Sequence, residues 1–532
     1  MIAPKDKKLS LNEQTVAEPI VRGWYAWPHL VSPISGALHL ANRQLKTLAS
    51  FVEDPELHEE AVKSPELRGG PFVDLPANKV EDVKRMIDQA AQRGHQMIEF
   101  GNQIRALTAT CDAARGANSL ESLYQEVPEM LDGHVEFFYN DMGHPSFRLF
   151  EGLLYETPLY NEQDQSLHLY LVDHEERAFA FSTPRPTDEV LVIDKPFKHP
   201  IHDLLGRLRF EAMPPSEIAA SLTAMGLPGD LLDPCLQEAP DNQTRHLPKA
   251  GSWRYFGHAC VLVTCKNGLN ILIDPLIPIN NLGADVPRFS FHDLPEQIDY
   301  VLLTHNHADH VVIETLLTLR HRIQTLLVPG SNGGICDPSL KLLLTAIGFE
   351  SVLALDPLDR VIAEGVEIRA LPFLGEHGDL DVASKLAWCV RDQGHTTVFA
   401  ADSNNVSPKM YQHIHRVIGP VDVMFLGMEC VGAPMSWVYG PLLLKPVDRR
   451  ADQSRRLNGS DSTRALDLIN TLECKQVFIY AMGREPWLSF IMSIDDDENT
   501  EQMRQAQMFI EACRQRNIPA ELLYGKSEGL VT

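Results

Sequence analysis

The sequence predicts an α/β protein in two parts, a mixed α+β amino-terminal domain (residues 1–245) and an α/β sandwich (246–532). From Gly251 onward, strand-like and helical segments alternate, an order that is typical of α/β sandwiches. A stretch rich in proline and polar residues, 232–249, is expected to link the two parts. A cluster of histidine and aspartate at 305–310 follows one strand, so we expect the functional loops along one edge of the sandwich.

The composition indicates a folded cytoplasmic protein. With 532 residues, 44% of them hydrophobic, the chain can bury a large core. The start of the chain lacks the apolar stretch of a signal peptide, and no segment approaches the roughly 20 apolar residues that span a bilayer. The net charge of −25 argues against binding to phosphate backbones, so we expect neither a membrane nor a nucleic acid as partner.

The amino-terminal region shows helical and strand patterns but no dense group of ligands. Val83, Met86, Ile87 and Ala90 recur at helical spacing. The predicted helices are 80–107 and 120–131, and the predicted strands are 167–172, 178–182 and 190–193. The histidines noted among these segments are isolated, so nothing here indicates catalysis.

The carboxyl-terminal region carries many short apolar runs separated by helical patterns. The nine cysteines of the whole chain are scattered and include no CxxC pair, so neither a disulfide framework nor a thiolate metal site is expected. The predicted helices are 313–322, 339–347, 408–418, 463–472 and 500–515. The predicted strands are 253–256, 259–264, 270–274, 300–304, 325–328, 351–355, 366–371, 387–390, 397–401, 423–426, 477–481 and 522–524.

The segment 300–310 ends an apolar strand with three imidazoles and one carboxylate. Side chains two apart on an extended chain point the same way, so His305 and His307 can face one metal ion. Asp309 and His310 follow at the turn into a helix and can reach a second ion. Imidazole with carboxylate is the ligand set of metals such as zinc, iron, manganese and cobalt.

Together with two further motifs, this segment resembles the metallo-β-lactamase superfamily. The motifs are 253–259 with Asp274 before Pro275, the cluster 305–310, and Asp402 in 399–403, and the resemblance covers roughly 250–532. It implies a four-layer αββα sandwich with one or two metals at the strand ends. It also implies that Asp274 is the acidic residue of the first motif and that Asp402 bridges two metals. From the residues alone, either aspartate is equally a turn or strand-end residue.

The remaining motifs depart from the pattern of a zinc hydrolase of this fold. The third motif places Glu376 directly beside His377, so either side chain can be the ligand, and no histidine follows His415. Compared with such a hydrolase, the site has therefore shifted from imidazole-rich toward oxygen-rich. Carboxylates are harder ligands that favour iron over zinc, and a missing last histidine leaves a coordination position open for O₂.

With these departures, the chain is similar to the diiron β-hydroxylases of nonribosomal peptide pathways, the group that includes the chloramphenicol β-hydroxylase. The resemblance implies two iron ions, O₂ and an external electron donor. It also implies a substrate, L-p-aminophenylalanine for the chloramphenicol enzyme, that is held as a thioester on a thiolation domain in antibiotic biosynthesis. The amino-terminal domain would then supply a surface for carrier docking or a homodimer contact. Carried over by motif, the ligands are His305, His307 and Glu376 on one iron, Asp309 and His310 on the other, and Asp402 between them.

Several residues near these motifs keep two interpretations. Glu429 is a further ligand, a partner of one, or a surface residue after a strand. Arginines at 449–450 and 455–456 form a docking patch for an acidic partner or a solvated loop. A loop at 432–440 either lines a substrate pocket or is only packed, and the candidate pocket residues are Met428, Ser436, Trp437 and Tyr439.

Three other functions compete with the hydroxylase. A dinuclear zinc hydrolase would cleave a thioester, lactone or phosphodiester with metal-bound hydroxide. A flavodiiron-like reductase normally has a glutamate where His307 stands and carries a flavin domain, and this chain shows no GxGxxG motif. A scaffold with a relict metal fold would bind a partner without catalysis.

Overall fold

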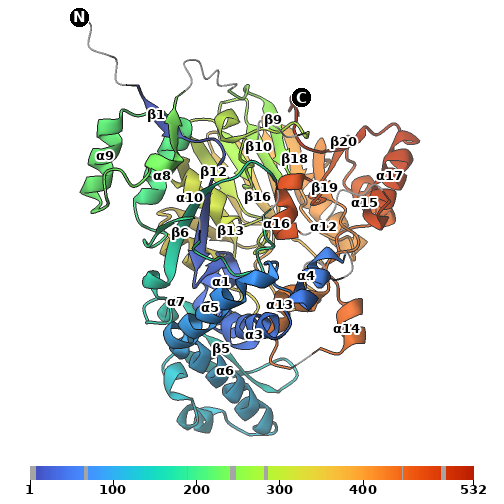
Figure 1. Ribbon diagram of the computed structural model, residues 1–532. Helices are drawn as coiled ribbons and strands as arrows, with labels where there is room; N and C mark the ends of the chain where they lie inside the picture. Colours follow the sequence, from blue (N-terminus) through green and yellow to red (C-terminus); the bar gives the residue numbers. More distant parts are fainter. Residues whose placement is uncertain are drawn as a thin grey trace, which may run out of the picture.

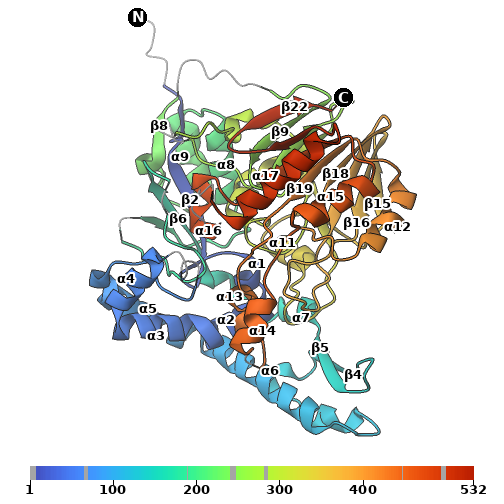
Figure 2. The same cartoon turned by 90° about the vertical axis from the view of Figure 1, so that its right-hand side faces the viewer.

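The computed structural model describes residues 7–531 except 65, 66, 68, 69, 176, 189, 240–246, 281–284, 446 and 493–498. Its centre is a pair of seven-stranded sheets, and the amino-terminal region packs against one side and one end of this pair (Figures 1 and 2). No helix in the described ranges combines the length and the apolar character that crossing a membrane requires.

The first sheet has the order β14-β13-β12-β11-β10-β9-β22. The strands β11 to β14 run parallel, so their carboxyl ends lie at one edge. This is the edge at which ligands bind in parallel sheets, outside the strand ends. The bounds are β9 Ser252–Gly257, β10 Cys260–Thr264, β11 Asn270–Ile273, β12 Ile298–Leu302, β13 Ile323–Pro329, β14 Val352–Leu355 and β22 Ser527–Leu530.

The second sheet has the order β15-β16-β17-β18-β19-β20-β21. Here β18 to β21 run parallel and bring a second row of strand ends to the site. The bounds are β15 Arg360–Ala363, β16 Val366–Leu371, β17 Ala387–Asp392, β18 His395–Phe399, β19 Val423–Gly427, β20 Gln476–Tyr480 and β21 Ala520–Leu522.

Three layers of apolar side chains hold the sandwich together. Trp253, Trp388, Phe399 and Phe425 are buried between the two sheets. The outer face of the first sheet packs on α10 (Ile313–Leu319) and α11 (Leu340–Ala346). The outer face of the second sheet packs on α12 (Pro408–Ile418), α15 (Ser462–Thr471) and α17 (Glu501–Arg514). The predicted αββα sandwich is therefore confirmed.

The amino-terminal region adds a four-stranded antiparallel sheet, two separate pairs of antiparallel strands and several helices. The sheet has the order β3-β2-β6-β7, with β3 Trp24–Tyr25, β2 Thr15–Val21, β6 Gln165–Leu171 and β7 Leu191–Ile193. The pairs are β1 Leu9–Leu11 with β8 Leu236–Glu238, and β4 Val135–Tyr139 with β5 Pro145–Leu149. The helices are α1 Pro28–Val31, α2 Pro33–His39, α3 Leu45–Glu53, α4 Pro55–Lys63, α5 Val80–Arg93, α6 His95–Ala113, α7 Glu151–Leu154, α8 Ile201–Phe210 and α9 Pro215–Ala224.

Four predictions in this region need correction. The helix expected over 80–107 is two helices that meet at Gly94, where a Cβ would lie 2.6 Å from a Leu40 methyl. The helix expected over 120–131 is two short 3₁₀ turns, because Pro128 cannot continue a helix. Residues 178–182 form no strand, since the Ala180 N–H donates to the Phe490 carbonyl instead of a ladder.

The fourth correction concerns the linker expected at 232–249. Residues 233–238 form a 3₁₀ turn and β8, which pairs with β1. Residues 240–246 of this stretch lie outside the described part of the chain. The boundary at 245/246 therefore stays a prediction.

In the sandwich, the predicted elements match with small shifts. β12 ends two residues before the expected Thr304, and β21 precedes most of the strand expected at 522–524. The strands β15 and β22 are not predicted, because both lie at or near sheet edges and alternate between exposed and half-buried residues.

Candidate metal centre

The strand ends of both sheets bring the candidate ligands together. Asp274 follows β11, His305 follows β12, and Asp402 follows β18. Asp274 and Ala401 have positive φ angles of 40° and 46°, which L-residues adopt at a cost. Such conformations concentrate at functional sites, where the surrounding structure enforces them.

One set of candidate ligands consists of His305, His307 and Glu376. His305 Nε2 lies 3.1 Å from His307 Nδ1, and His307 Nδ1 lies 3.5 Å from Glu376 Oε1. The three side chains are at most 8% exposed and offer ligand atoms that are all within 4.8 Å of one another. This spacing suits a single ion held by two imidazoles and one carboxylate.

A second set consists of His258, Asp309 and His310. Asp309 Oδ2 lies 3.0 Å from His258 Nε2 and 3.5 Å from His310 Nε2. His258 is fully buried and sits in the turn between β9 and β10 with a φ of 49°. The ligand atoms of this second set also lie within 4.8 Å of one another.

Asp402 stands between the two sets. Its Oδ2 lies 2.8 Å from His310 Nε2 and 3.7 Å from His305 Nε2, and these three residues form a third set of candidate ligands. Asp402 Oδ1 is buried without a hydrogen-bond partner among the described residues. Buried polar atoms normally have a partner, and a metal ion would supply it.

The electrostatics of the cluster favour a bound cation. Burial alone would lower the pKa of His310, but the carboxylates of Asp402, Asp309 and Asp274 outweigh it and hold that pKa well above its usual range. Burial, followed by the repulsion of Asp402, raises the pKa of Glu376. The raised pKa values of His310 and Glu376 both reflect several carboxylates buried close together. Two metal ions would supply the positive charge that stabilises these carboxylates. The residues therefore fit a dinuclear centre.

Asp274 orients the cluster without joining any of the three sets. Its Oδ2 accepts from Thr304 Oγ1 (2.6 Å) and from His310 Nδ1 (2.8 Å), and its Oδ1 accepts from the Thr304 N–H. A proton fixed on Nδ1 leaves His310 Nε2 free for the metal, an arrangement that metalloproteins use to set the tautomer.

The third-motif loop places Glu376 and His377 differently. Glu376 belongs to a ligand set, whereas the His377 ring stacks on the His307 ring at a centroid distance of 4.7 Å. His377 Nδ1 faces the Gly375 carbonyl at 3.2 Å. The geometry supports Glu376 as the ligand, and it remains a proposal. Of the arginines at 449–450 and 455–456, Arg455 donates to the Gly378 carbonyl and so supports this loop.

Glu429 lies near the cluster but is in none of the three sets. Burial, together with the charges of Asp402 and Asp309, raises the pKa of Glu429 well above its usual range. This placement fits a neighbour of the ligands better than a surface residue.

The four candidate pocket residues fall into two groups. Met428 is fully buried in the core under α12 and α15, which gives no support to its expected place in a pocket. Tyr439 is also fully buried, and its hydroxyl lies 2.8 Å from His307 Nε2, so it supports a ligand. Ser436 and Trp437 do line a cleft, on the side of α13 (Met435–Tyr439) that faces the amino-terminal helices.

The strand end that lacks a final histidine has a positioning role. The Tyr480 hydroxyl at the end of β20 accepts from the Ala401 N–H at 3.0 Å, directly before Asp402. The next residue, Ala481, donates its N–H to the His258 carbonyl. The β20 end thus holds the backbone on both sides of the centre.

Two histidines near the centre are missed by sequence reasoning. His258 occurs in the first motif, but a lone histidine in a hairpin gives no ligand spacing. His29 in α1 is fully buried with its ring 5.7 Å from the Tyr439 ring, and neither ring nitrogen has a hydrogen-bond partner in the described part of the chain. More than 400 residues separate His29 from Tyr439 in the sequence, so no local pattern could predict this contact.

Comparison with known proteins identifies the family. Residues 10–240 match the model of the diiron non-heme β-hydroxylase N-terminal domain, and residues 269–446 match the β-lactamase superfamily domain. A relative from Streptomyces venezuelae, 4-amino-L-phenylalanyl-[CmlP-peptidyl-carrier-protein] 3-hydroxylase, is 36% identical over 97% of this chain and 98% of its own length. This chain belongs to the diiron non-heme β-hydroxylases.

Solved structures agree with this assignment. The crystal structure of CmlA, a diiron β-hydroxylase from Streptomyces venezuelae, superposes with a TM-score of 0.92 at 34% identity, covering 99% of this chain and 100% of that one. A metal-dependent hydrolase from Enterococcus faecalis is 42% identical, but only over 55 residues, which are 10% of this chain and 22% of its own. The resemblance to the β-hydroxylase family is confirmed, and membership in that family implies iron.

Proposed function

We propose that this β-hydroxylase uses two iron ions and O₂ to hydroxylate the β-carbon of an amino acid held as a thioester on a peptidyl carrier domain. The amino acid we propose is 4-amino-L-phenylalanine, the residue named for the Streptomyces relative. The observation that carries the proposal is the cluster of carboxylates and imidazoles in a chain that matches this relative from end to end.

The side chains of the cluster would divide the work between two irons. His305, His307 and Glu376 would hold one ion, Asp309 and His310 the other, and Asp402 both. His258 is a further candidate ligand on the side of Asp309. Bound iron supplies the redox chemistry that activates O₂, and a carboxylate-rich ligand set suits that metal.

The surrounding residues keep the ligands in one geometry and exclude water. Asp274 holds a proton on His310 Nδ1, and the Tyr439 hydroxyl lies at hydrogen-bond distance from His307 Nε2, on the far side of the ring from Glu376. His305 and His310 are completely buried, which protects the centre from bulk water. Exclusion of water suppresses side reactions of an oxidising centre.

The proposal includes two partners besides the substrate. Electrons would come from an external donor, because the sequence shows no dinucleotide, flavin or iron–sulfur motif. The carrier domain would deliver the substrate, so that binding energy controls when O₂ reacts. A homodimer contact through the amino-terminal region stays a prediction.

The test is a single-turnover reaction of the reduced protein with O₂. One sample contains 4-amino-L-phenylalanine loaded on its carrier domain, and a matched sample contains the free amino acid with the unloaded carrier. We expect a product one oxygen atom heavier only with the loaded carrier. Equal hydroxylation of the free amino acid would refute delivery by a carrier, and hydrolysis of the thioester without oxidation would support a hydrolase.

A further inference from the structure

A cleft of about 780 Å³ lies where the amino-terminal helices meet the loop after α13. In Figure 2, α13 and α14 (Arg449–Ser454) lie beside α2. Both α2 and the π-helical turn Leu40–Gln44 contact the turn Gly440–Leu442, which follows α13. One wall carries Arg43, Lys46 and Arg105, and the other carries Ser436 and Trp437. Two parts of the chain that are almost 400 residues apart thus form one recess.

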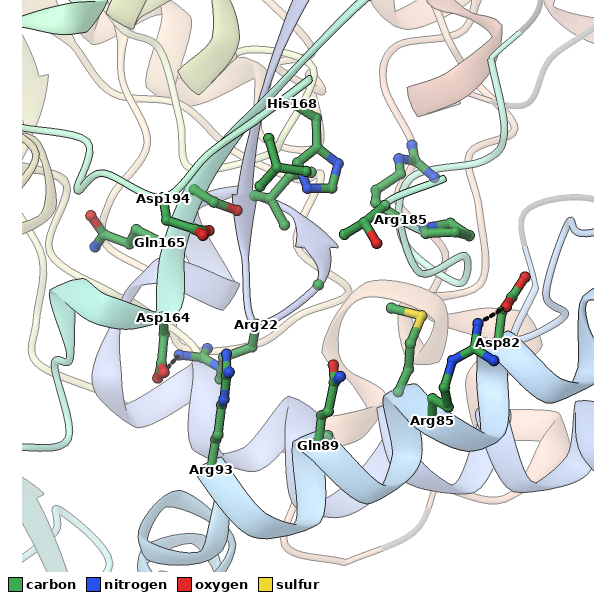
Figure 3. Close-up of a pocket in the computed structure, with 18 of the residues that line it drawn as sticks. Arg22, Asp82, Arg85, Gln89, Arg93, Asp164, Gln165, His168, Arg185 and Asp194 are labelled. Atoms are coloured by element: carbon green, nitrogen blue, oxygen red, sulfur yellow. Dashed lines mark hydrogen bonds and ion pairs between the residues drawn. The ribbon is translucent and has the colours of Figure 1, made fainter. Parts of the chain in front are cut away.

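The cleft is positively charged on a strongly acidic protein. Among the described residues, its lining includes Arg43, Lys46 and Arg105 but no aspartate or glutamate, although the chain has a net charge of −25. A smaller pocket of about 200 Å³ between α5 and β6 shows the usual balance, with four arginines and four aspartates in its lining. There, Arg85 pairs with Asp82, and Arg22 lies near Asp164 (Figure 3).

The three cations of the cleft have different tasks. Arg43 donates to the backbone carbonyls of Trp437 and Ser436, and burial lowers its pKa to about 10, so it stays charged at neutral pH while it holds α13. Lys46 and Arg105 are exposed, and neither forms an ion pair with any residue that the structure describes. These two side chains are available to an anion.

Helix α13 separates the cleft from the metal centre. Trp437 lines the cleft, whereas Tyr439, two residues later, reaches His307 on the other side. Two residues of an α-helix turn by about 200°, so these side chains leave opposite faces of one helix roughly 10 Å wide. The cleft therefore ends about one helix diameter from the candidate ligands.

We propose that this cleft binds the phosphopantetheine arm of the carrier domain, with Lys46 and Arg105 contacting its phosphate. This inference rests on the proposed function, because only a carrier-bound substrate brings such an arm. The phosphate is the one anionic group of the arm, and it matches a recess whose described lining carries cations and no carboxylate. The methyl groups of the arm would pack on the apolar lining, which includes Phe72, Trp437, Leu443, Leu444 and Val447. To bring the thioester to the centre, the arm would have to pass α13.

The experiment measures binding of 4′-phosphopantetheine and of pantetheine, which lacks the phosphate, to the iron-loaded full-length protein by calorimetry at low salt. We expect the phosphate to improve Kd about tenfold or more, as a charge-assisted contact does. Lys46→Ala and Arg105→Ala should each reduce this ratio, and the double variant should bring it close to one. Lys46→Arg should keep it. Lys341→Ala, which removes an exposed lysine from α11, is the matched control and should leave the ratio unchanged.

Three results would overturn the proposal. They are equal binding of the two compounds by the parent protein, an unchanged ratio in the double variant, or binding of inorganic phosphate as tight as that of 4′-phosphopantetheine. The hydroxylation assay distinguishes failure of the cleft proposal from failure of the proposed function. In that assay, Lys46→Ala should raise the concentration of loaded carrier that gives half the maximal single-turnover rate, and it should leave the maximal rate unchanged. A parent protein that binds the arm but never hydroxylates would contradict the proposed function alone.

Discussion

In the sandwich, several candidate ligands lie within a few residues of strand ends, whereas the amino-terminal region approaches the same centre through the His29 ring. Asp274, His305 and Asp402 are placed by β11, β12 and β18, and each needs only its own strand. His29 instead reaches Tyr439 across a contact between distant parts of the chain. The sandwich thus provides the metal chemistry, and the amino-terminal region encloses it and forms half of the cleft.

This difference separates two kinds of effect. Changes at the strand ends should alter metal content, because they remove ligands or the residues that orient them. Changes at the contact between the two regions should alter substrate binding or stability while metal remains bound. Four variants, ordered from the largest expected effect to the smallest, probe this division.

Asp402→Ala should have the largest effect. It removes the carboxylate that lies between the two ligand sets and leaves His310 Nε2 without its 2.8 Å neighbour. We expect loss of at least one iron and a hydroxylation rate below about one-thousandth of the parent, since metal-based stabilisation amounts to several kcal/mol. Metal analysis and single-turnover assays measure both. Asp422→Ala is the control and should keep both irons, because Asp422 precedes β19 at the end of the strand far from the site and accepts from the Thr396 N–H. Full iron content in Asp402→Ala would show that Asp402 is not a ligand.

Glu376→Ala should remove one of the two irons, whereas His377→Ala should retain both. The two residues share one loop, but only Glu376 belongs to a set of candidate ligands. Iron content per chain, measured after purification and desalting, distinguishes them. The opposite pattern, with iron lost from His377→Ala alone, would reverse the assignment of the third-motif ligand.

Tyr439→Phe should weaken the centre moderately. It removes a hydroxyl 2.8 Å from His307 Nε2 and keeps the buried ring. The loss of an outer hydrogen bond to a ligand typically costs 10- to 100-fold in metal affinity or activity. Competition with a chelator reports the affinity. Tyr160→Phe, which removes a hydroxyl partner of Gln165, is the control; equal affinities in both variants would exclude a role for the Tyr439 hydroxyl.

Glu151→Gln should have the smallest effect and should appear only in stability. Glu151 joins the two regions by accepting from Ser32 Oγ and from the Ser339 N–H, and burial raises its pKa to about 7. The folded protein therefore holds this proton more tightly than the unfolded chain, so the contribution of Glu151 to stability is lost as pH rises toward 7.

An amide at position 151 can keep both hydrogen bonds without a charge. At pH 8, Glu151→Gln should raise the unfolding free energy by on the order of 2 kcal/mol, and the Tm should therefore be higher than that of the parent. At pH 5 the difference should be much smaller. A difference of the same size at both pH values would show that the glutamate is not responsible.

The sequence groups the candidate ligands at the strand ends because each ligand motif is local. The spacing of His305, His307, Asp309 and His310 places them together before any tertiary contact is known, and the structure brings them within the distances a metal requires. The place of His258 among the candidate ligands and the contact of Tyr439 with His307 could not be predicted in this way, because they join separate loops. The Leu120–Leu131 helix failed because Pro128 overrides the apolar pattern.

We infer that the three carboxylates in the candidate ligand set, together with the missing last histidine, favour two irons over two zincs at this centre. The most direct test is the metal content of the full-length protein purified without added metal, measured beside the single-turnover reaction with the loaded carrier. We predict about two irons per chain, little zinc, and a product one oxygen atom heavier. About two zincs, no iron and no oxygen incorporation would contradict the claim.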